Sequence, residues 1–143
     1  MERLLQRSGT ASVVIIDDTD EIRFLVRISL EAGGDFEVVG EADNGLEGID
    51  VVARTQPDLV LLDLRMPVMT GLDALPRIKR ACPTTRVVVL SGFSSASMAG
   101  PALDAGADGY AQKGMSPVEI AQYAAFVLNG PSAPHIPQQS RRS

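Results

Sequence analysis

Five short runs of apolar, largely β-branched residues alternate along the chain with segments whose apolar positions recur at helical spacing. The apolar runs predict strands over residues 12–16, 36–40, 58–63, 86–91 and 109–112. The other segments predict helices over about residues 20–32, 45–56, 71–81, 94–105 and 116–128. The central runs show no polar alternation, which is typical of strands covered by helices on both faces.

Alternating strands and helices predict an α/β fold of the flavodoxin-like kind, a doubly wound five-stranded parallel sheet with helices on both faces. Right-handed crossovers leave few topologies, and strand order 2-1-3-4-5 is the common one at this size. In that order the first and third strands are neighbours. Polar residues that follow the strands therefore meet at one edge of the sheet.

Residues that carry chemistry follow four of the predicted strands. Asp17 and Asp18 end the first strand, and Asp63 ends the third, about 5 Å away across the sheet. Ser91 ends the fourth, and Lys113 follows the fifth, roughly 10 Å from Asp63 but within reach of a long side chain. Each residue also has a plainer interpretation, as a turn and helix cap, a strand cap or a solvated loop lysine. Their positions at adjacent strand ends favour one shared site.

The helical pattern is weakest over residues 94–105, where Gly100 and Pro101 interrupt it. Proline favours the start of a helix over its middle, so we expect this helix to start late or to be frayed at its beginning. The last helix has a complete start signal, with Ser116 as N-cap, Pro117 at the first position and Glu119 at the third.

Length and composition indicate one globular domain, since 143 residues with 45% hydrophobic content leave room for a single core. We expect an N-terminal extension over residues 1–11, a folded domain over 12–129 and a disordered tail or linker stub over 130–143. The single cysteine, Cys82, excludes a disulfide framework and fits a reducing cytoplasm. We expect neither a membrane span nor a signal peptide, because no apolar run has the required length.

Charge and residue inventory exclude several classes of function. A net charge of −5 and a pI near 4.8 argue against direct nucleic acid binding by this chain. The only histidine, His135, lies among prolines near the end, which removes Ser-His-Asp catalysis and a Cys/His zinc site. Neither a G-x-x-x-x-G-K-[ST] loop nor a G-x-G-x-x-G turn is present to hold a nucleotide.

The convergence of carboxylates predicts a metal-assisted chemistry. Three carboxylates at one sheet edge repel each other unless a cation lies between them. Mg²⁺ suits this role because it takes oxygen ligands, commonly one or two carboxylates with water and phosphate oxygens. A carboxylate beside Mg²⁺, a hydroxyl and an ammonium group is suited to phosphoryl transfer, with the carboxylate as nucleophile. The phosphoryl donor must come from another molecule.

Four motifs stand at or after the predicted strand ends: Asp17-Asp18, Asp63-Leu-Arg-Met-Pro-Val-Met-Thr-Gly71, Ser91-Gly92 and Gly106-Ala-Asp-Gly-Tyr-Ala-Gln-Lys113. With these motifs the chain resembles the receiver domain of two-component response regulators over about residues 12–128. The resemblance implies a signalling switch, not a turnover enzyme. Asp63 would accept a phosphoryl group from a phosphohistidine on a sensor histidine kinase or phosphotransfer protein. Mg²⁺, or Mn²⁺ in its place, would be held by Asp18, Asp63 and the backbone carbonyl of Arg65, with Asp17 acting through water.

The resemblance also implies how the signal would leave the site. Ser91 and Lys113 would bind phosphoryl oxygens, and Tyr110 would move inward behind Ser91. The surface of the fourth helix, fifth strand and last helix would then bind an unknown output partner or a second copy of the chain. Arg65 and Phe93 resemble positions that tune how fast water removes the phosphoryl group.

Two departures from the family pattern leave alternatives open. Gly114 follows Lys113 where the family usually has proline, and the Gly-Pro break falls in the fourth helix. They motivate a degenerate receiver that acts as a phosphate-independent interaction module. A phosphatase-like hydrolase with an aspartyl nucleophile is a further alternative, but such enzymes usually carry a second acid where this chain has Arg65. Tyr110 has a plainer interpretation too, packed half-exposed on the sheet edge.

Overall fold

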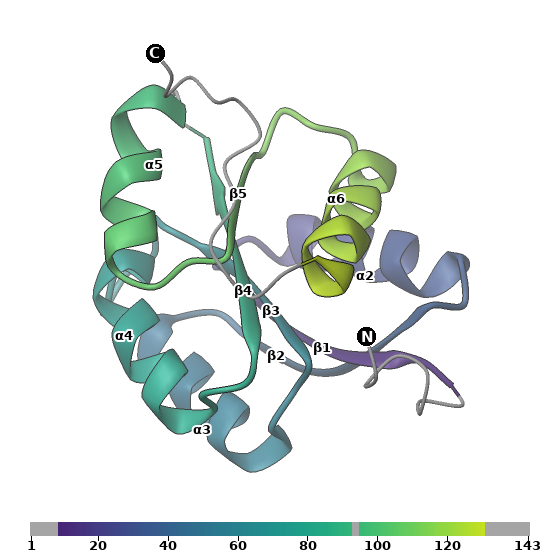
Figure 1. The fold of residues 1–143 in the computed structure, drawn as a ribbon, viewed down its shortest axis with the longest axis horizontal. Coiled ribbons are helices and arrows are strands. Elements are labelled where there is room, and N and C mark those ends of the chain that lie inside the picture. The colour runs from purple at the N-terminus through teal and green to yellow at the C-terminus, as the bar shows by residue number, and fades with distance from the viewer. Residues whose placement is uncertain (1–8, 93–94, 131–143) are drawn as a thin grey trace.

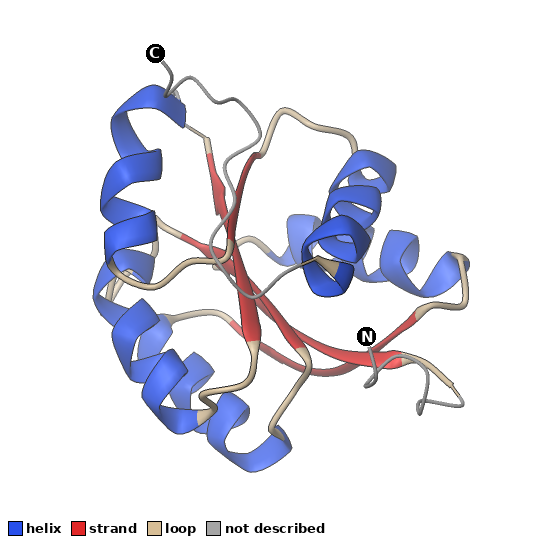
Figure 2. Ribbon diagram, in the orientation of Figure 1, coloured by secondary structure: helices blue, strands red, loops and turns tan. Residues whose placement is uncertain are grey.

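A central sheet separates two layers of helices, α2 and α6 on one face and α3, α4 and α5 on the other (Figure 1, Figure 2). The computed structural model describes residues 9–92 and 95–130, with side chains described for 9–92 and 99–130. The predicted N-terminal extension up to residue 8, the tail from residue 131, Phe93 and His135 therefore lie outside the described residues.

The sheet has five parallel strands in the order β2-β1-β3-β4-β5, which confirms the predicted fold and strand order. The strands are β1 (Ala11–Ile16), β2 (Phe36–Ala42), β3 (Leu59–Asp63), β4 (Arg86–Ser91) and β5 (Gly109–Gln112). The helices are α2 (Asp20–Ala32), α3 (Gly45–Thr55), α4 (Gly71–Ala81), α5 (Ser95–Asp104) and α6 (Pro117–Asn129).

Local signals explain where several helices begin and end. At the start of α6, the Glu119 N–H donates to Ser116 Oγ and the Ser116 N–H donates to Glu119 Oε1, which confirms the predicted capping box. The Asn44 side chain caps α3 by accepting from Glu47 N–H. After α2, Gly34 adopts a φ of +81°, a conformation that favours glycine.

Helix α5 begins at Ser95 and contains Pro101 in its interior, so the expected late start is wrong, and the frayed beginning stays a prediction. Proline removes one hydrogen bond toward the preceding turn. The next turn nevertheless continues, because Ala105 N–H donates to Pro101 O at 3.0 Å. Ala99 and Ala102 are buried against the sheet, and this packing outweighs the weak local preference.

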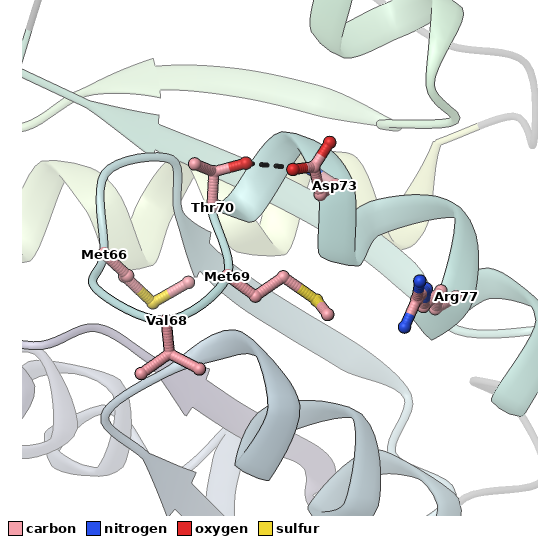
Figure 3. A pocket seen from close by; sticks show the side chains of 6 residues that line it. All are labelled: Met66, Val68, Met69, Thr70, Asp73 and Arg77. Atoms are coloured by element: carbon pink, nitrogen blue, oxygen red, sulfur yellow. Dashed lines mark hydrogen bonds between the residues drawn. The ribbon is translucent and has the colours of Figure 1, made fainter.

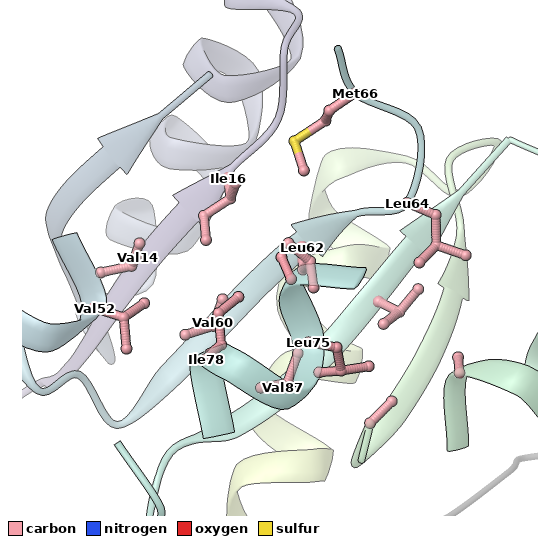
Figure 4. Close-up of a cluster of buried hydrophobic side chains, with 14 of the residues drawn as sticks. Val14, Ile16, Val52, Val60, Leu62, Leu64, Met66, Leu75, Ile78 and Val87 are labelled. Atoms are coloured by element: carbon pink, nitrogen blue, oxygen red, sulfur yellow. The ribbon is translucent and has the colours of Figure 1, made fainter. Parts of the chain in front are cut away.

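Two apolar clusters hold the layers together. One lies between the sheet and helices α3, α4 and α5, and Figure 4 shows Val60, Leu62 and Leu75 at its centre. The other lies under α2 and α6. Every residue of β3 is buried, so the strand that ends at Asp63 is rigidly embedded between both clusters.

Candidate functional site

The carboxylates of Asp17, Asp18 and Asp63 meet at the carboxyl end of the sheet, as predicted. Strands β1 and β3 are direct neighbours, with Ile16 opposite Leu62, so Asp17 and Asp63 leave the sheet side by side. One carboxylate oxygen from each of the three residues lies within 4.8 Å of the others. Asp17 and Asp63 are 0% and 1% exposed, whereas Asp18 faces solvent.

Lys113 reaches the same site from the loop between β5 and α6. Its Nζ lies 3.2 Å from Asp17 Oδ2 and 3.1 Å from Asp63 Oδ2. The Lys113 N–H donates to Ser91 O at 2.9 Å, which ties this loop to the end of β4. Gly114 in place of the family proline therefore leaves Lys113 within reach of both carboxylates.

Burial and like charge shape the electrostatics of the site. Burial, and then the charge of Asp17, raises the pKa of Asp63 from 3.8 to about 6, although the Arg65 N–H and Lys113 act in the opposite direction. Burial alone would lower the pKa of Lys113, but the charges of Asp17 and Asp63 outweigh it and raise that pKa. The site thus holds more negative charge than its single ammonium group compensates.

The oxygen atoms present fit a hard divalent cation. Asp17 Oδ1 accepts from Thr19 N–H at 2.9 Å and Asp63 Oδ1 accepts from Arg65 N–H at 3.1 Å, which fixes both carboxylates. The Oδ2 atoms of Asp17 and Asp63 are buried, and the partner that the described residues give them is the Lys113 ammonium group, 3.2 Å and 3.1 Å away. With the exposed Asp18 carboxylate beside them, they form the all-oxygen set that Mg²⁺ prefers. A hollow of about 370 Å³ lies beside Asp18 and is lined by Asp18, Arg65, Met66 and Thr70.

The loop between β3 and α4 is held close to Asp63 by a glycine. A Cβ on Gly71 would lie 2.1 Å from Asp63 O and 2.8 Å from Leu64 Cα. The Gly71 N–H donates to Leu64 O at 2.9 Å, which closes the loop. Only glycine permits this approach, so α4 starts against the backbone at the end of β3.

Val68 lies in that loop with a φ of +71° and is 74% exposed. The Met69 N–H donates to Pro67 O at 2.7 Å, so Val68 is the central residue of a tight γ-turn. Val68 lines a second hollow of about 460 Å³. Met66, Met69 and the α4 residue Arg77 line it as well (Figure 3). No sequence signal indicates this turn, because β-branched residues disfavour positive φ.

The remaining predicted residues have distinct environments. Ser91 is buried at the end of β4, one residue beyond the Leu90 that lies opposite Asp63. Tyr110 is 5% exposed and packs in the cluster beneath α5, so its half-exposed alternative is wrong. Its hydroxyl is buried and has no hydrogen-bond partner among the described residues. The Arg65 side chain is exposed at the mouth of the site.

Arg23 is a site residue that the sequence pattern did not reveal. Its guanidinium donates to the backbone carbonyl of Asp17 and pairs with Asp20 and with Glu41, the latter at 3.1 Å. The signal in the sequence is slight: Arg23 lies one helical turn after Thr19, the residue that precedes α2.

None of the helices described by the structure has the length and apolar character needed to cross a membrane.

Comparison with known proteins gives a consistent result. The family model for the response regulator receiver domain matches residues 13–125. The uncharacterized transcriptional regulatory protein YhcZ of Bacillus subtilis is 42% identical over 108 residues, which are 76% of this chain and 50% of that protein. This chain therefore spans half the length of that relative.

Two solved structures show the same architecture. The receiver domain of the putative response regulator NarL from Mycobacterium tuberculosis has a TM-score of 0.80 at 31% identity, with 86% of this chain and 99% of that chain covered. A response regulator from Burkholderia pseudomallei, solved with a phosphorylated aspartic acid, a calcium ion and citrate, has a TM-score of 0.72 at 26% identity, with 80% and 65% covered. The chain belongs to the response regulator receiver domain family of two-component signal transduction.

Proposed function

We propose that this chain is a phosphorylation-operated switch in which Asp63 accepts a phosphoryl group. The observation that carries the proposal is the meeting of three carboxylates with Lys113, whose Nζ lies 3.1 Å from Asp63 Oδ2. In the Burkholderia relative an aspartic acid is phosphorylated in the same fold. The donor is a phosphohistidine on a sensor kinase or phosphotransfer protein: its N–P bond breaks, the O–P bond to Asp63 forms, and the imidazole leaves with the electron pair.

The residues of the site would have different roles in this phosphoryl transfer. Asp18, Asp63 and the Arg65 carbonyl would hold Mg²⁺, with Asp17 acting through water, and the bound ion would neutralise charge on the phosphoryl oxygens. Lys113, whose Nζ lies within 3.2 Å of both Asp17 and Asp63, would neutralise a further oxygen. The raised pKa of Asp63, about 6, still leaves most of the carboxylate ionised near neutral pH, as a nucleophile requires.

The phosphodonor needs a docking surface beside Asp63. Helix α2 starts three positions after Asp17 and exposes Phe24, Leu25 and Ile28 by 51%, 43% and 47%. Such an apolar stripe on a surface helix is typical of a protein contact. We propose that these residues contact the kinase or phosphotransfer protein, because the helix that carries them starts close to Asp17 and the site that the donor must reach.

The output surface comprises α5, β5 and α6. Phosphate would add nearly two negative charges at Asp63, by analogy with other phosphorylated side chains. In the conformation that phosphorylation would favour, Ser91 would contact a phosphoryl oxygen and Tyr110 would lie inward behind Ser91. Phosphorylation would thus shift a pre-existing equilibrium. Val118 and Phe126 on α6 are 58% and 54% exposed, which suits contact with an output partner or a second copy of the chain.

A degenerate, phosphate-independent receiver is the second candidate function, and it is motivated by Gly114 and by the Gly-Pro break in the fourth helix. The ion pairs of Lys113 with Asp17 and Asp63 favour the switch instead, because the ammonium group is in position without the proline. Retained partner binding by an Asp63→Ala variant, with no response of the wild type to phosphodonors, would restore this candidate.

The test is phosphorylation by acetyl phosphate, followed by intact-protein mass spectrometry with Mg²⁺ and with a chelator. We expect one added phosphoryl group in the wild type with Mg²⁺, little without it, and none in Asp63→Asn. Asp73→Asn is the matched control, because Asp73 is an exposed carboxylate on the adjacent helix. An unmodified wild type, or equal modification of Asp63→Asn, would refute the assignment.

A further inference from the structure

Arg23 connects the acidic site with α2 and β2 through three oxygen acceptors. Its Nη1 donates to the backbone carbonyl of Asp17, its Nη2 pairs with Asp20, and its Nε lies 3.1 Å from Glu41 Oε1. Only 15% of the Arg23 side chain is exposed. Burial would lower the pKa of Arg23, but its hydrogen bonds and charge interactions with Asp20 and Glu41 hold that pKa above its ordinary value. The guanidinium is thus a fixed, permanent cation.

Two hydrogen bonds hold the loop that carries Asp17 and Asp18. The Thr19 N–H donates to Asp17 Oδ1 at 2.9 Å. The Arg23 guanidinium donates to the backbone carbonyl of Asp17, a residue that is 0% exposed. A buried carbonyl needs a donor, so loss of Arg23 would free the loop to rearrange toward another partner.

The hydrogen bond from Arg23 to the Asp17 carbonyl, called the Arg23 brace below, acts against a repulsion between carboxylates within the site. Carboxylate oxygens of Asp17, Asp18 and Asp63 lie within 4.8 Å of one another, and like charges so close drive their side chains apart. A loop held in place keeps the oxygens converged before a cation arrives, which reduces the rearrangement that binding requires. We propose that Arg23 is a positioning residue that holds Asp17 and Asp18 in the geometry that binds a divalent cation. This inference rests on the cation site of the proposed function.

The direction in which Arg23→Met changes the Mg²⁺ affinity distinguishes a positioning role of Arg23 from a purely electrostatic one. Arg23 carries a positive charge close to the site, and that charge repels a cation. If charge alone mattered, Arg23→Met would strengthen Mg²⁺ binding. If Arg23 positions the ligands, the same variant weakens binding even though a repulsive charge has gone.

Arg27 provides a matched control one turn along α2. Its Nε lies 3.0 Å from Glu41 Oε2, the same carboxylate that Arg23 contacts. Its guanidinium also lies over the Phe24 ring, 5.6 Å from the centroid. Among the described residues Arg27 makes no hydrogen bond to the Asp17 carbonyl, so Arg27→Met removes a neighbouring positive charge and leaves the brace intact.

The experiment is titration calorimetry of the full chain with MgCl₂ alone, for wild type, Arg23→Met, Arg23→Lys and Arg27→Met. We expect Mg²⁺ to bind roughly tenfold more weakly to Arg23→Met, and to Arg27→Met as to the wild type. Arg23→Lys should be intermediate, because an ammonium group lacks the planar fork that holds several acceptors at once. Urea unfolding of each variant measures stability separately, since a merely structural role would lower the free energy of unfolding and leave the Mg²⁺ affinity of the folded protein unchanged.

Each outcome decides the inference. Binding by Arg23→Met that is as tight as in the wild type, or tighter, overturns it, and so does an equal loss in Arg27→Met. If Arg23→Met does not fold, Arg23→Lys decides, and unchanged affinity there overturns the inference. A wild type that binds no Mg²⁺ contradicts the metal site of the proposed function, and the inference with it. Normal wild-type binding with an unaffected Arg23 variant contradicts the inference alone.

Discussion

Asp63→Asn should stabilise the metal-free protein at neutral pH, because folding of the wild type buries the Asp63 carboxylate next to the negative charge of Asp17. Burial and the charge of Asp17 raise the pKa of Asp63 from 3.8 to about 6. A carboxyl group whose pKa is raised by folding adds stability below its unfolded pKa and loses it as the pH rises through the folded one. That difference between the two pKa values corresponds to about 3 kcal/mol. Asparagine has the shape of the protonated acid without its charge, so the variant avoids this loss.

The stability difference between Asp63→Asn and the wild type should depend on pH, so it is measured at two pH values. Without metal, the free energy of unfolding of Asp63→Asn should exceed that of the wild type by about 3 kcal/mol at about pH 7.5, and by about half as much near pH 5. Urea unfolding followed by circular dichroism in a chelating buffer measures both values. Asp73→Asn is the control and should change stability by less than about 0.5 kcal/mol. Added Mg²⁺ should stabilise the wild type and narrow its gap to the Asp63 variant.

Two results would refute this reasoning. One is an Asp63→Asn variant that is no more stable than the wild type near neutral pH without metal. The other is a stability difference that stays the same at both pH values, since a buried carboxylate that titrates near pH 6 requires it to change.

Three further substitutions test the parts of the fold that hold the site. Gly71→Ala would bring a Cβ to 2.1 Å from a backbone carbonyl at the end of β3, and we expect a loss of about 3 kcal/mol in urea unfolding, with Gly114→Ala unchanged because nothing lies within 4 Å there. Lys79→Met removes the 2.8 Å partner of the buried Asp108 carboxylate and should lower the free energy of unfolding by about 2–3 kcal/mol, and an unchanged midpoint would contradict this. Ser116→Ala removes the α6 N-cap and should lower the free energy of unfolding, measured by thermal denaturation, by about 1 kcal/mol. An unchanged free energy of unfolding would show that the capping box contributes little.

Much of the site could be predicted from the residues that follow the strands. Asp17, Asp63 and Lys113 were each predicted because parallel strands direct the residues after them to one edge of a sheet. The order of the strands, confirmed here, then determined which residues are neighbours. The reach of Lys113 across two strands was also predictable, since it depends on side-chain length and the regular spacing of strands.

Other features had no local signal. Val68 occupies a φ of +71° although its side chain disfavours that region, and α5 runs through Pro101 although proline predicts an interruption. The contacts of Arg23 join residues of β1, α2 and β2, and no periodicity along one segment reveals such a junction. The burial of Tyr110 depends likewise on how α5 packs over β5.

Hydrophobic periodicity, cap residues and the polar residues after each apolar run were enough to establish the five strand–helix units, their class of fold and the members of the acidic site. These properties depend on neighbours within a few positions, so the order of residues specifies them. Distances, burial and the pKa of Asp63 came only with the folded chain, because they are sums over residues that lie far apart in the sequence. The Arg23 brace belongs to this second group, since its three acceptors meet only after the sheet and α2 have packed together.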